Sequence, residues 1–347
     1  MRKLASIRMI DEVKVHPNAD ALELAVIGGW QCVVKKGEFV SGDLCVYFEV
    51  DSVLPCLPEY EFLRKGCYRS ASWLPNGEGF RLKTIKLRGK ISQGLALHLE
   101  SINAQWLNEH KMPDVDVTEF LNVVKWDPPE NAQLGGQPKG TFPYFIPKTD
   151  QERAQNIMQE IRSANESGDV FEVSIKLDGS SCTMFYYDGE VGVCSRNQEL
   201  KINEENAGNT FVRMIQQTGV ADFLKSHGRN IAIQGELMGP GIEGNRENFG
   251  EHKFFIYDIY DIDKQDYLKP SEREEFYDHV LMPAGVQVYH VPVINYEGTV
   301  PGTIEELLKA ADGWSVENPI REGLVYKHCG GGFSFKIISN EFLMGEE

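Results

Sequence analysis

Long apolar runs are missing from this 347-residue chain, in which no stretch approaches the ~20 apolar residues of a membrane span. The first residues, M-R-K-L-A-S-I-R-M-I-D-E, lack the apolar core of a signal peptide. The seven cysteines are odd in number and scattered, without a C-x-x-C pair, which argues against a disulfide framework or a structural zinc site. We therefore expect an intracellular protein of the cytoplasm, without excluding the nucleus, and no membrane partner. We also expect a monomer.

Positive charge is scarce as well, since 35 Lys and Arg stand against 52 Asp and Glu, for a net charge of −17. This balance weighs against a nucleic-acid partner. The shortage of positive charge is uneven, however. Residues 1–125 contain 16 basic and 16 acidic residues, whereas the rest of the chain contains 19 basic and 36 acidic residues. Because binding to phosphates depends on local patches more than on total charge, the acidity does not exclude such a partner.

Residues 1–126 are typical of a domain of short strands, with two β-rich runs flanking the turn at 41–43, and this pattern predicts a small barrel. One stretch, R-L-K-T-I-K-L-R-G-K, has five basic residues and no acid: Arg81, Lys83, Lys86, Arg88 and Lys90. On a single strand, Lys86, Arg88 and Lys90 would share a face. The stretch is then either a strand edge protected by charge or a track for a phosphate backbone, and the sequence leaves both open.

Residues 127–143 are dense in Pro, Gly and polar residues, which indicates a linker. Residues 144–347 alternate strands and helices and predict a second domain. Pairs spaced as capping boxes predict helices that begin near Thr149, Ser271 and Thr303. A further helix is expected over about 206–226.

The stretch V-S-I-K-L-D-G (173–179) has the clearest chemical character of the chain. Its alternating apolar residues predict a half-buried strand that ends at Lys176 and runs into a tight turn. A lysine is a nucleophile only when deprotonated, and its free pKa is about 10.4, so desolvation or neighbouring cations must lower that pKa. Taken alone, K-x-D-G favours the simpler interpretation of a lysine at the end of a hairpin strand, because short motifs often match by chance.

Charged residues of both signs interrupt the apolar strands of the second domain: Lys176, Asp178, Arg196, Glu236, Glu322, Lys327 and Lys336. Because a buried charge without a partner is costly, this pattern indicates one shared site. The cationic side chains could hold a phosphate and lower the pKa of one lysine, and the carboxylates could hold a hard cation such as Mg²⁺. These features together predict nucleotidyl transfer onto a lysine.

Six ordered motifs resemble those of the covalent nucleotidyltransferases, the superfamily of ATP-dependent ligases and mRNA capping enzymes: K-L-D-G (176–179), S-R (195–196), G-E-L (235–237), F-F-I-Y-D-I (254–259), E-G-L-V-Y-K (322–327) and S-F-K (334–336). G-E-L-M-G-P-G-I (235–242) is similar to the RNA ligase 2 type. H-P-N-A-D-A-L-E-L (16–24) resembles the opening of OB-type tRNA-binding modules. An OB domain placed first is similar to one branch of RNA ligases. Because only about ten residues follow Lys336, we expect no OB domain after the catalytic one.

The resemblance implies an α+β protein with an N-terminal OB-type β-barrel and a C-terminal nucleotidyltransferase domain of antiparallel sheets with flanking helices. It implies an ATP-dependent RNA ligase that joins 5′-phosphate and 3′-OH ends of nicked duplexes or broken strands, as in RNA repair, through lysyl-AMP and RNA-adenylate. A DNA ligase, an mRNA guanylyltransferase or a non-catalytic RNA-binding protein are the alternatives.

The resemblance also implies roles for single residues. Lys176 would be the nucleophile, with Lys327 and Lys336 on the α-phosphate, and the metal, Mg²⁺ or Mn²⁺, would lie among Asp178, Glu236 and Glu322. The residues implied to contact ATP or AMP are Ile175, Arg196, Glu236, Tyr257, Glu322, Lys327 and Lys336, with Tyr257 at the position of an adenine-stacking aromatic. Many relatives have two lysines in the last motif, whereas this chain has Ser334 in place of the first. RNA would contact the basic stretch from Arg81 to Lys90.

Overall fold

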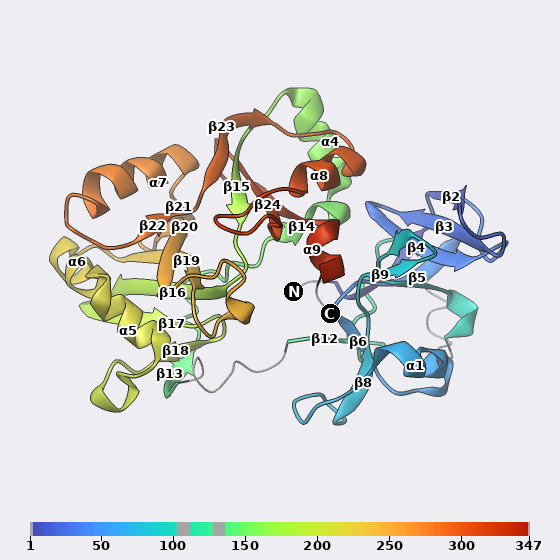
Figure 1. Ribbon diagram of the computed structural model, residues 1–347, viewed down its shortest axis with the longest axis horizontal. Helices are drawn as coiled ribbons and strands as arrows, with labels where there is room; N and C mark the ends of the chain where they lie inside the picture. The colour runs from blue at the N-terminus through green and yellow to red at the C-terminus, as the bar shows by residue number, and fades with distance from the viewer. Residues whose placement is uncertain (1–2, 103–111, 128–135, 346–347) are drawn as a thin grey trace. The chain divides into compact units, whose positions relative to one another are not determined.

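The computed structural model describes residues 3–102, 112–127 and 136–345. The chain divides into two compact units, and each mixes strands with short helices (Figure 1). The first unit comprises Met1–Pro129, Gln155–Met158 and Leu343–Glu347, and the second comprises Glu130–Ala154 and Gln159–Phe342. No helix within the described ranges is long and apolar enough to cross a membrane.

The first unit consists of antiparallel sheets, and strand β5 lies at its centre. Val46 and Phe48 of β5 belong to one apolar core, whereas Cys45 and Tyr47 belong to another, so this strand is buried on both faces. Strand pairing in the described part of this unit does not close a barrel. The sheets are β1 (Ala5–Met9), β5 (Leu44–Phe48) and β11 (Leu95–His98); β2 (Glu12–Val15), β3 (Leu22–Ile27) and β4 (Trp30–Lys35); β12 (Val124–Lys125), β6 (Ser52–Leu54), β8 (Glu78–Arg81) and β7 (Tyr68–Ser70); and the hairpin β9 (Ile85–Leu87) with β10 (Lys90–Ser92). Its short helices are η1 (Pro58–Leu63), α1 (Arg64–Cys67) and η2 (Leu99–Ser101).

The described part of the second unit contains two sheets. The larger one orders its strands as β13 (Pro138–Thr141), β18 (Gln198–Leu200), β17 (Glu190–Cys194), β16 (Ser180–Tyr187), β19 (Ile231–Met238), β20 (Lys253–Asp261) and β21 (Asp266–Tyr267), and β22 (Tyr289–His290) pairs with β20. The smaller one orders them as β14 (Glu152–Arg153), β25 (Ser334–Ile338), β24 (Gly323–His328), β15 (Val170–Lys176) and β23 (Val293–Thr299). Most neighbouring strands are antiparallel, but β14 with β25 and β20 with β22 are parallel.

Helices flank these sheets (Figure 1). They are α4 (Met158–Ser167), α5 (Thr210–Gln217), α6 (Val220–His227), α7 (Pro270–Phe276) and α8 (Ile304–Ala311), with single turns η4 (Glu204–Asn206), η5 (Glu243–Asn245) and η6 (Tyr277–Leu281). The turn η3 (Ala154–Asn156) and the last described helix, α9 (Asn340–Gly345), each contain residues of both units. The largest apolar core joins α5 and α6 to the larger sheet, with Phe211 and Leu224 packed against Met184, Ile233 and Phe254.

Several local predictions differ from the structure. The helix expected at Thr149 begins only at Met158, because Glu152 and Arg153 form β14 against β25 and the next residues form the single turn η3. The helix expected over 206–226 is two helices separated at Gly219, whose φ of 77° is left-handed. At α7 the cap is the bond from the Lys269 N–H to Glu272, so a box based on Ser271 is wrong.

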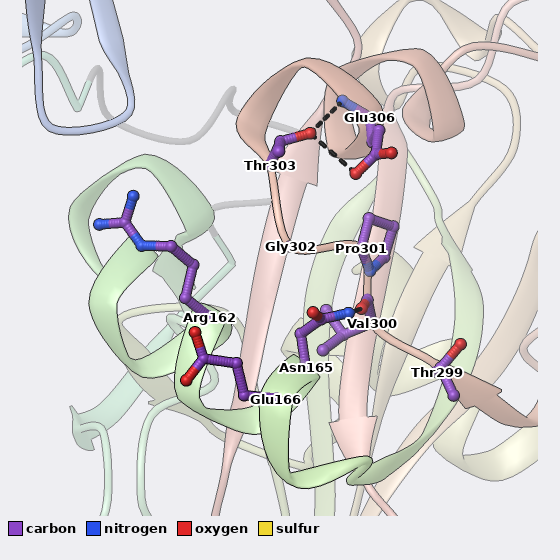
Figure 2. A pocket seen from close by; sticks show the side chains of 9 residues that line it. All are labelled: Arg162, Asn165, Glu166, Thr299, Val300, Pro301, Gly302, Thr303 and Glu306. Atoms are coloured by element: carbon purple, nitrogen blue, oxygen red, sulfur yellow. Dashed lines mark hydrogen bonds between the residues drawn. The ribbon is translucent and has the colours of Figure 1, made fainter.

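One helix start was predicted correctly, and one segment contains a strand that was not predicted. The Thr303 box is confirmed, since the Thr303 hydroxyl accepts from the Glu306 N–H and donates to its carboxylate (Figure 2). The segment 127–143, which we interpreted as a linker, contains strand β13, which pairs with β18.

Candidate active site

Lys176 lies where the two sheets of the second unit meet. It is the last residue of β15 in the smaller sheet, and β16 of the larger sheet begins at Ser180. The two strands pair with other neighbours and not with each other, so K-L-D-G connects two sheets, and the hairpin interpretation is wrong. Gly179 permits this connection, because a Cβ there would lie 2.6 Å from the Leu237 carbonyl oxygen and 2.9 Å from the Glu236 side chain.

The closest partner of Lys176 is Glu322. The Lys176 Nζ donates to Glu322 Oε2 at 2.6 Å, and the two side chains are 25% and 15% exposed. Glu322 directly precedes β24, whose first residue, Gly323, is the register partner of Lys176. Antiparallel pairing of β15 with β24 therefore brings the lysine and the carboxylate together.

The electrostatics of this region are dominated by negative charge. Burial acts to lower the pKa of Lys176, but the nearby Glu322 and Glu236 carboxylates outweigh it, and the pKa is raised. Burial and then the Glu322 charge raise the pKa of Asp178 to about 7. Burial also raises the pKa of Glu236 to about 8, against the opposing effect of Lys176. The unliganded site thus holds more carboxylate charge than its lysine neutralises.

A divalent cation would relieve this repulsion, and the carboxylate oxygens of Asp178, Glu236 and Glu322 are the donors that Mg²⁺ and Mn²⁺ accept. Within the described ranges, no group of three or more His, Cys, Asp or Glu is close enough to surround a metal ion directly. The described residues therefore do not form a ready-made cage of three direct protein ligands around an ion.

Lys336 and Arg196, the latter in the turn after β17, share a partner. The Nζ of Lys336, on β25, lies 3.9 Å from an Asp150 carboxylate oxygen, and Arg196 Nη2 lies 3.2 Å from the other. Burial, and next the charge of Lys176, lower the pKa of Lys336 to about 7. Asp150, which the sequence motifs do not include, thus links two of the predicted phosphate and ribose contacts.

Lys327 faces a different set of groups. Its Nζ donates to Asp258 Oδ1 at 2.6 Å and to the Tyr257 carbonyl oxygen at 2.5 Å. Burial lowers its pKa, against the opposing effect of Asp258. The structure therefore brings Lys327 to Tyr257 and does not bond it to Lys176 or Glu322.

Tyr257 and Ile175 belong to one apolar cluster, in which Ile175 is buried and Tyr257 packs against the buried residues. The Tyr257 hydroxyl lies 3.0 Å from Ser181 Oγ, which lies 3.2 Å from Thr149 Oγ1. Burial raises the pKa of Tyr257, so its hydroxyl keeps the proton and the side chain stays neutral. An apolar surface with hydroxyl groups at its edge could accept a planar heterocycle.

Two arginines near these residues were not predicted from the sequence. Arg273 on α7 is fully buried, and its guanidinium donates to Glu172 at 2.5 Å and to the Tyr257 carbonyl oxygen at 3.0 Å. Arg246, in the loop after β19, places Nε 3.2 Å from Asp178 Oδ2. Neither has a local signal, because P-S-E-R-E-E-F is typical of an exposed helix start and G-N-R-E-N of a surface loop.

The basic stretch of the first unit is not a single strand. Arg81 ends β8, and Arg88 (φ 46°) with Gly89 forms the turn of the β9–β10 hairpin, in which Lys90 pairs with Leu87. The prediction that Lys86, Arg88 and Lys90 share one strand face is therefore wrong. Arg81 also lies 3.3 Å from Asp51 and over the Trp126 ring, whereas Lys86 and Arg88 are exposed.

Comparison with known proteins agrees with this arrangement. The RNA ligase family matches residues 169–338, and an OB-fold domain matches residues 4–99. No curated protein sequence matches the chain. Among solved structures, Naegleria gruberi RNA ligase with pyrophosphate is 42% identical, with a TM-score of 0.91 and coverage of 99% of this chain and 98% of that one.

Mutant structures of the same Naegleria enzyme give similar values. One with ATP and Mn is 41% identical, with a TM-score of 0.91 and 98% coverage of each chain. Another, with AMP and Mn, is 41% identical, with a TM-score of 0.91 and coverage of 99% and 98%. This similarity extends over both units and favours an RNA ligase over the DNA ligase and guanylyltransferase alternatives. The chain belongs to the RNA ligase family, as an α+β protein with an N-terminal OB-fold domain and a C-terminal RNA ligase domain.

Proposed function

We propose that the protein is an ATP-dependent RNA ligase in which Lys176 carries AMP between the two half-reactions. The observation that carries this proposal is the position of Lys176, at a junction of two sheets, 2.6 Å from Glu322 and within electrostatic reach of Glu236, Asp178 and Lys336. The similar Naegleria ligase structures with ATP, AMP, Mn and pyrophosphate support this choice of substrate and cation.

In the first step, the neutral Lys176 amine attacks the α-phosphorus of ATP, and the bond to the bridging oxygen of the β-phosphate breaks. The ammonium proton of Lys176 passes to solvent before attack, a second proton leaves the nitrogen as the phosphoramide forms, and pyrophosphate departs with the electron pair. The charge of Lys336 disfavours the protonated form of Lys176 and can stabilise charge on the α-phosphate, a role shared with Lys327 once ATP draws it from Asp258. Arg196 and Glu236 contact the ribose, and Ile175 and Tyr257 contact the adenine.

Asp178, Glu236 and Glu322 would hold Mg²⁺ or Mn²⁺, partly through water. Such a cation supplies charge neutralisation at the α-phosphate and lowers the pKa of a nearby amine. Release of Glu322 from its bond to Lys176 is the change that this chain must make, because the same carboxylate serves the lysine in the unliganded protein.

The RNA steps follow from the same phosphoramide. A 5′-phosphate oxygen of the RNA attacks the AMP phosphorus, the P–N bond breaks, and Lys176 is regenerated. The RNA 3′-OH then attacks the activated 5′-phosphate, forming the phosphodiester and releasing AMP. We place this chemistry in residues 144–347, and nick binding in the OB domain, residues 1–126, joined by 127–143. The exposed Lys86 and Arg88, with Arg81, Lys83 and Lys90, are the proposed phosphate contacts.

We further propose that the substrate is a nicked duplex or a broken strand, and that the protein acts as a monomer in cytoplasmic RNA repair. The free thiols of all seven cysteines are consistent with a reducing compartment. The exposed side chains of the β9–β10 hairpin are suited to a duplex backbone, which presents regularly spaced phosphates.

Labelling with α-³²P-ATP tests the proposal. The wild-type chain with Mn²⁺ should acquire acid-labile label that survives denaturation, and Lys176→Ala should acquire none. Lys264→Ala is the matched control, because Lys264 is an exposed lysine of the same unit paired with Asp261. Normal labelling of Lys176→Ala would place the nucleophile elsewhere, and failure of the wild type to seal a nicked RNA duplex would refute the ligase activity.

A further inference from the structure

The loop that follows β19 has an unusual backbone. Between Gly239 and Phe249, six residues have a positive φ, and three of them carry side chains: Glu243 (40°), Asn245 (47°) and Asn248 (53°). Such angles are unfavourable for residues with a Cβ, and Asn tolerates them better than Glu. Backbone in this state persists only where its surroundings fix it, and it concentrates at functional sites.

Buried contacts fix this loop. Glu247 is only 6% exposed, and its Oε2 accepts hydrogen bonds from the N–H groups of Glu317 (2.6 Å) and Asn318 (3.0 Å). Asn318 Nδ2 in turn donates to the Arg246 carbonyl oxygen at 2.8 Å. Because residues 317 and 318 lie shortly before Glu322, the loop also supports the segment that carries this carboxylate.

Arg246 projects from the loop toward the site. Its Nε lies 3.2 Å from Asp178 Oδ2, and its guanidinium carbon lies 4.4 Å from the centre of the Phe342 ring. The side chains of Arg246 and Asp178 are 34% and 23% exposed, so water only partly screens the pair. One loop thus touches all three carboxylate-bearing segments: it follows Glu236 in the chain, supports residues before Glu322, and pairs with Asp178.

We propose that Arg246 is a positioning residue for lysine adenylylation, whose guanidinium, held by this strained loop, keeps the Asp178 carboxylate beside Lys176 before ATP binds. The inference rests on the proposed function, since Arg246 acts only through Asp178. A purely structural arginine, which only ties the loop to Phe342, would influence the reaction independently of Asp178. That difference makes the two roles separable.

A double-mutant cycle on the single-turnover rate of lysyl-AMP formation, at saturating ATP and Mn²⁺, tests the coupling. Arg246→Met should slow the reaction about 10-fold, the scale expected when a reacting group is misplaced by a fraction of an ångström. Arg246→Lys, which keeps a cation for Asp178, should be at least ~3-fold faster than Arg246→Met. When Asp178 is already replaced by Asn, adding Arg246→Met should lower the rate by less than ~2-fold, because Arg246 no longer has its charged partner.

Arg229→Met is the matched control, since Arg229 forms a 3.0 Å ion pair with Asp261 in the same unit. It should react at the wild-type rate. Thermal unfolding of each variant provides a readout without activity, and the losses from Arg246→Met and Asp178→Asn should again be less than additive. If Arg246→Met does not fold, the comparison of Arg246→Lys with Arg246→Gln replaces it.

Three results would overturn the inference: a wild-type rate for Arg246→Met, an equal fold-loss in both backgrounds, or no gain from lysine over methionine. A wild-type rate for Asp178→Asn would instead refute the role that the proposed function gives to Asp178. The failure of Arg246 and the failure of the site assignment are therefore distinguishable.

Discussion

The charge balance around Lys176 predicts an effect that needs no substrate: Lys176→Met should destabilise the unliganded protein. The mutation removes the cation that lies 2.6 Å from Glu322 and within electrostatic reach of Glu236 and Asp178. At an effective dielectric constant of 20, charges at that distance attract by about 6 kcal/mol, and desolvation and partial exposure leave a net loss of about 2–3 kcal/mol. For a unit of this size, that loss corresponds to a fall in melting temperature of about 4–10 °C.

The loss should depend on pH in a defined direction. At pH 8.5 Asp178 and Glu236, whose pKa values are raised to about 7 and about 8, are mostly ionised and repel one another once Lys176 is gone. At pH 6 both are mostly protonated, so the same mutation should cost less. Calorimetry of the whole chain without ATP or metal measures the loss of stability at each pH. A second scan with ATP shows which unfolding transition belongs to the unit that holds Lys176, because bound ATP raises the temperature of that transition.

Two further variants complete this experiment. Lys264→Met removes an exposed lysine paired with Asp261 and should change the melting temperature little. Adding Glu322→Gln to Lys176→Met should restore part of the lost stability, because the unpaired carboxylate is removed with its partner. Equal stability of Lys176→Met and the wild type at pH 8.5, or strict additivity of the two mutations, would refute the electrostatic reasoning.

Three other predictions concern the same residues and the first unit. Glu236→Ala and Glu322→Ala should each slow RNA sealing at least ~10²-fold, the loss typical of one deleted electrostatic stabiliser, and near-normal sealing by both would contradict the assignment. The unliganded protein should lose stability as pH rises from about 5 to 7, by roughly 2 kcal/mol for each of Asp178 and Glu236, because their raised pKa values make the folded state bind more protons than the unfolded one. Urea denaturation should show a flatter dependence in Glu236→Gln, and an unchanged slope would count against those pKa values. Replacing Lys86, Arg88 and Lys90 together by alanine should flatten the salt dependence of nick affinity by about one unit of slope per lost phosphate contact, with lysyl-AMP formation preserved. Unchanged affinity across a salt titration would place the RNA surface elsewhere.

Sequence reasoning succeeded where a residue's position follows from local strand pattern. Lys176 ends an alternating strand, Lys336 interrupts another, and Glu322 directly precedes a third, so the strand patterns alone indicated that these charges converge. Prediction from the sequence failed where the position of a side chain depends on contacts with segments far away in the chain. Arg246 and Arg273 have no local signature, and their roles arise from Asp178 and Tyr257, which are far away in the sequence.

The incorrect secondary-structure predictions have similar causes. The residues after Thr149 have a good cap spacing, but pairing with β25 overrides that local preference. The spacing of Lys86, Arg88 and Lys90 matches the two-residue repeat of a strand. Gly89, however, allows the chain to reverse direction between them, and the repeat alone does not reveal that turn. The pairing of Lys327 with Asp258 likewise depends on how β24 and β20 meet, which neither strand encodes by itself.

The junction at Lys176 has a consequence for the order in which the protein folds. Strand β15 pairs with β23 and β24, which begin at residues 293 and 323, so it waits for partners that are synthesised much later. Strand β16, only four residues beyond Lys176, can pair with β17 as soon as residues 190–194 emerge. At a synthesis rate of about 5–20 residues per second, the half of the site on the larger sheet can assemble several seconds before the half on the smaller one. A nascent chain that stops short of residue 323 would therefore contain Lys176 and Glu236 but not β24, the strand that brings Glu322 to Lys176. Such long-range pairing also makes this sheet the slow step of refolding, so a ligase returning from denaturant should recover lysine labelling later than its local hairpins form.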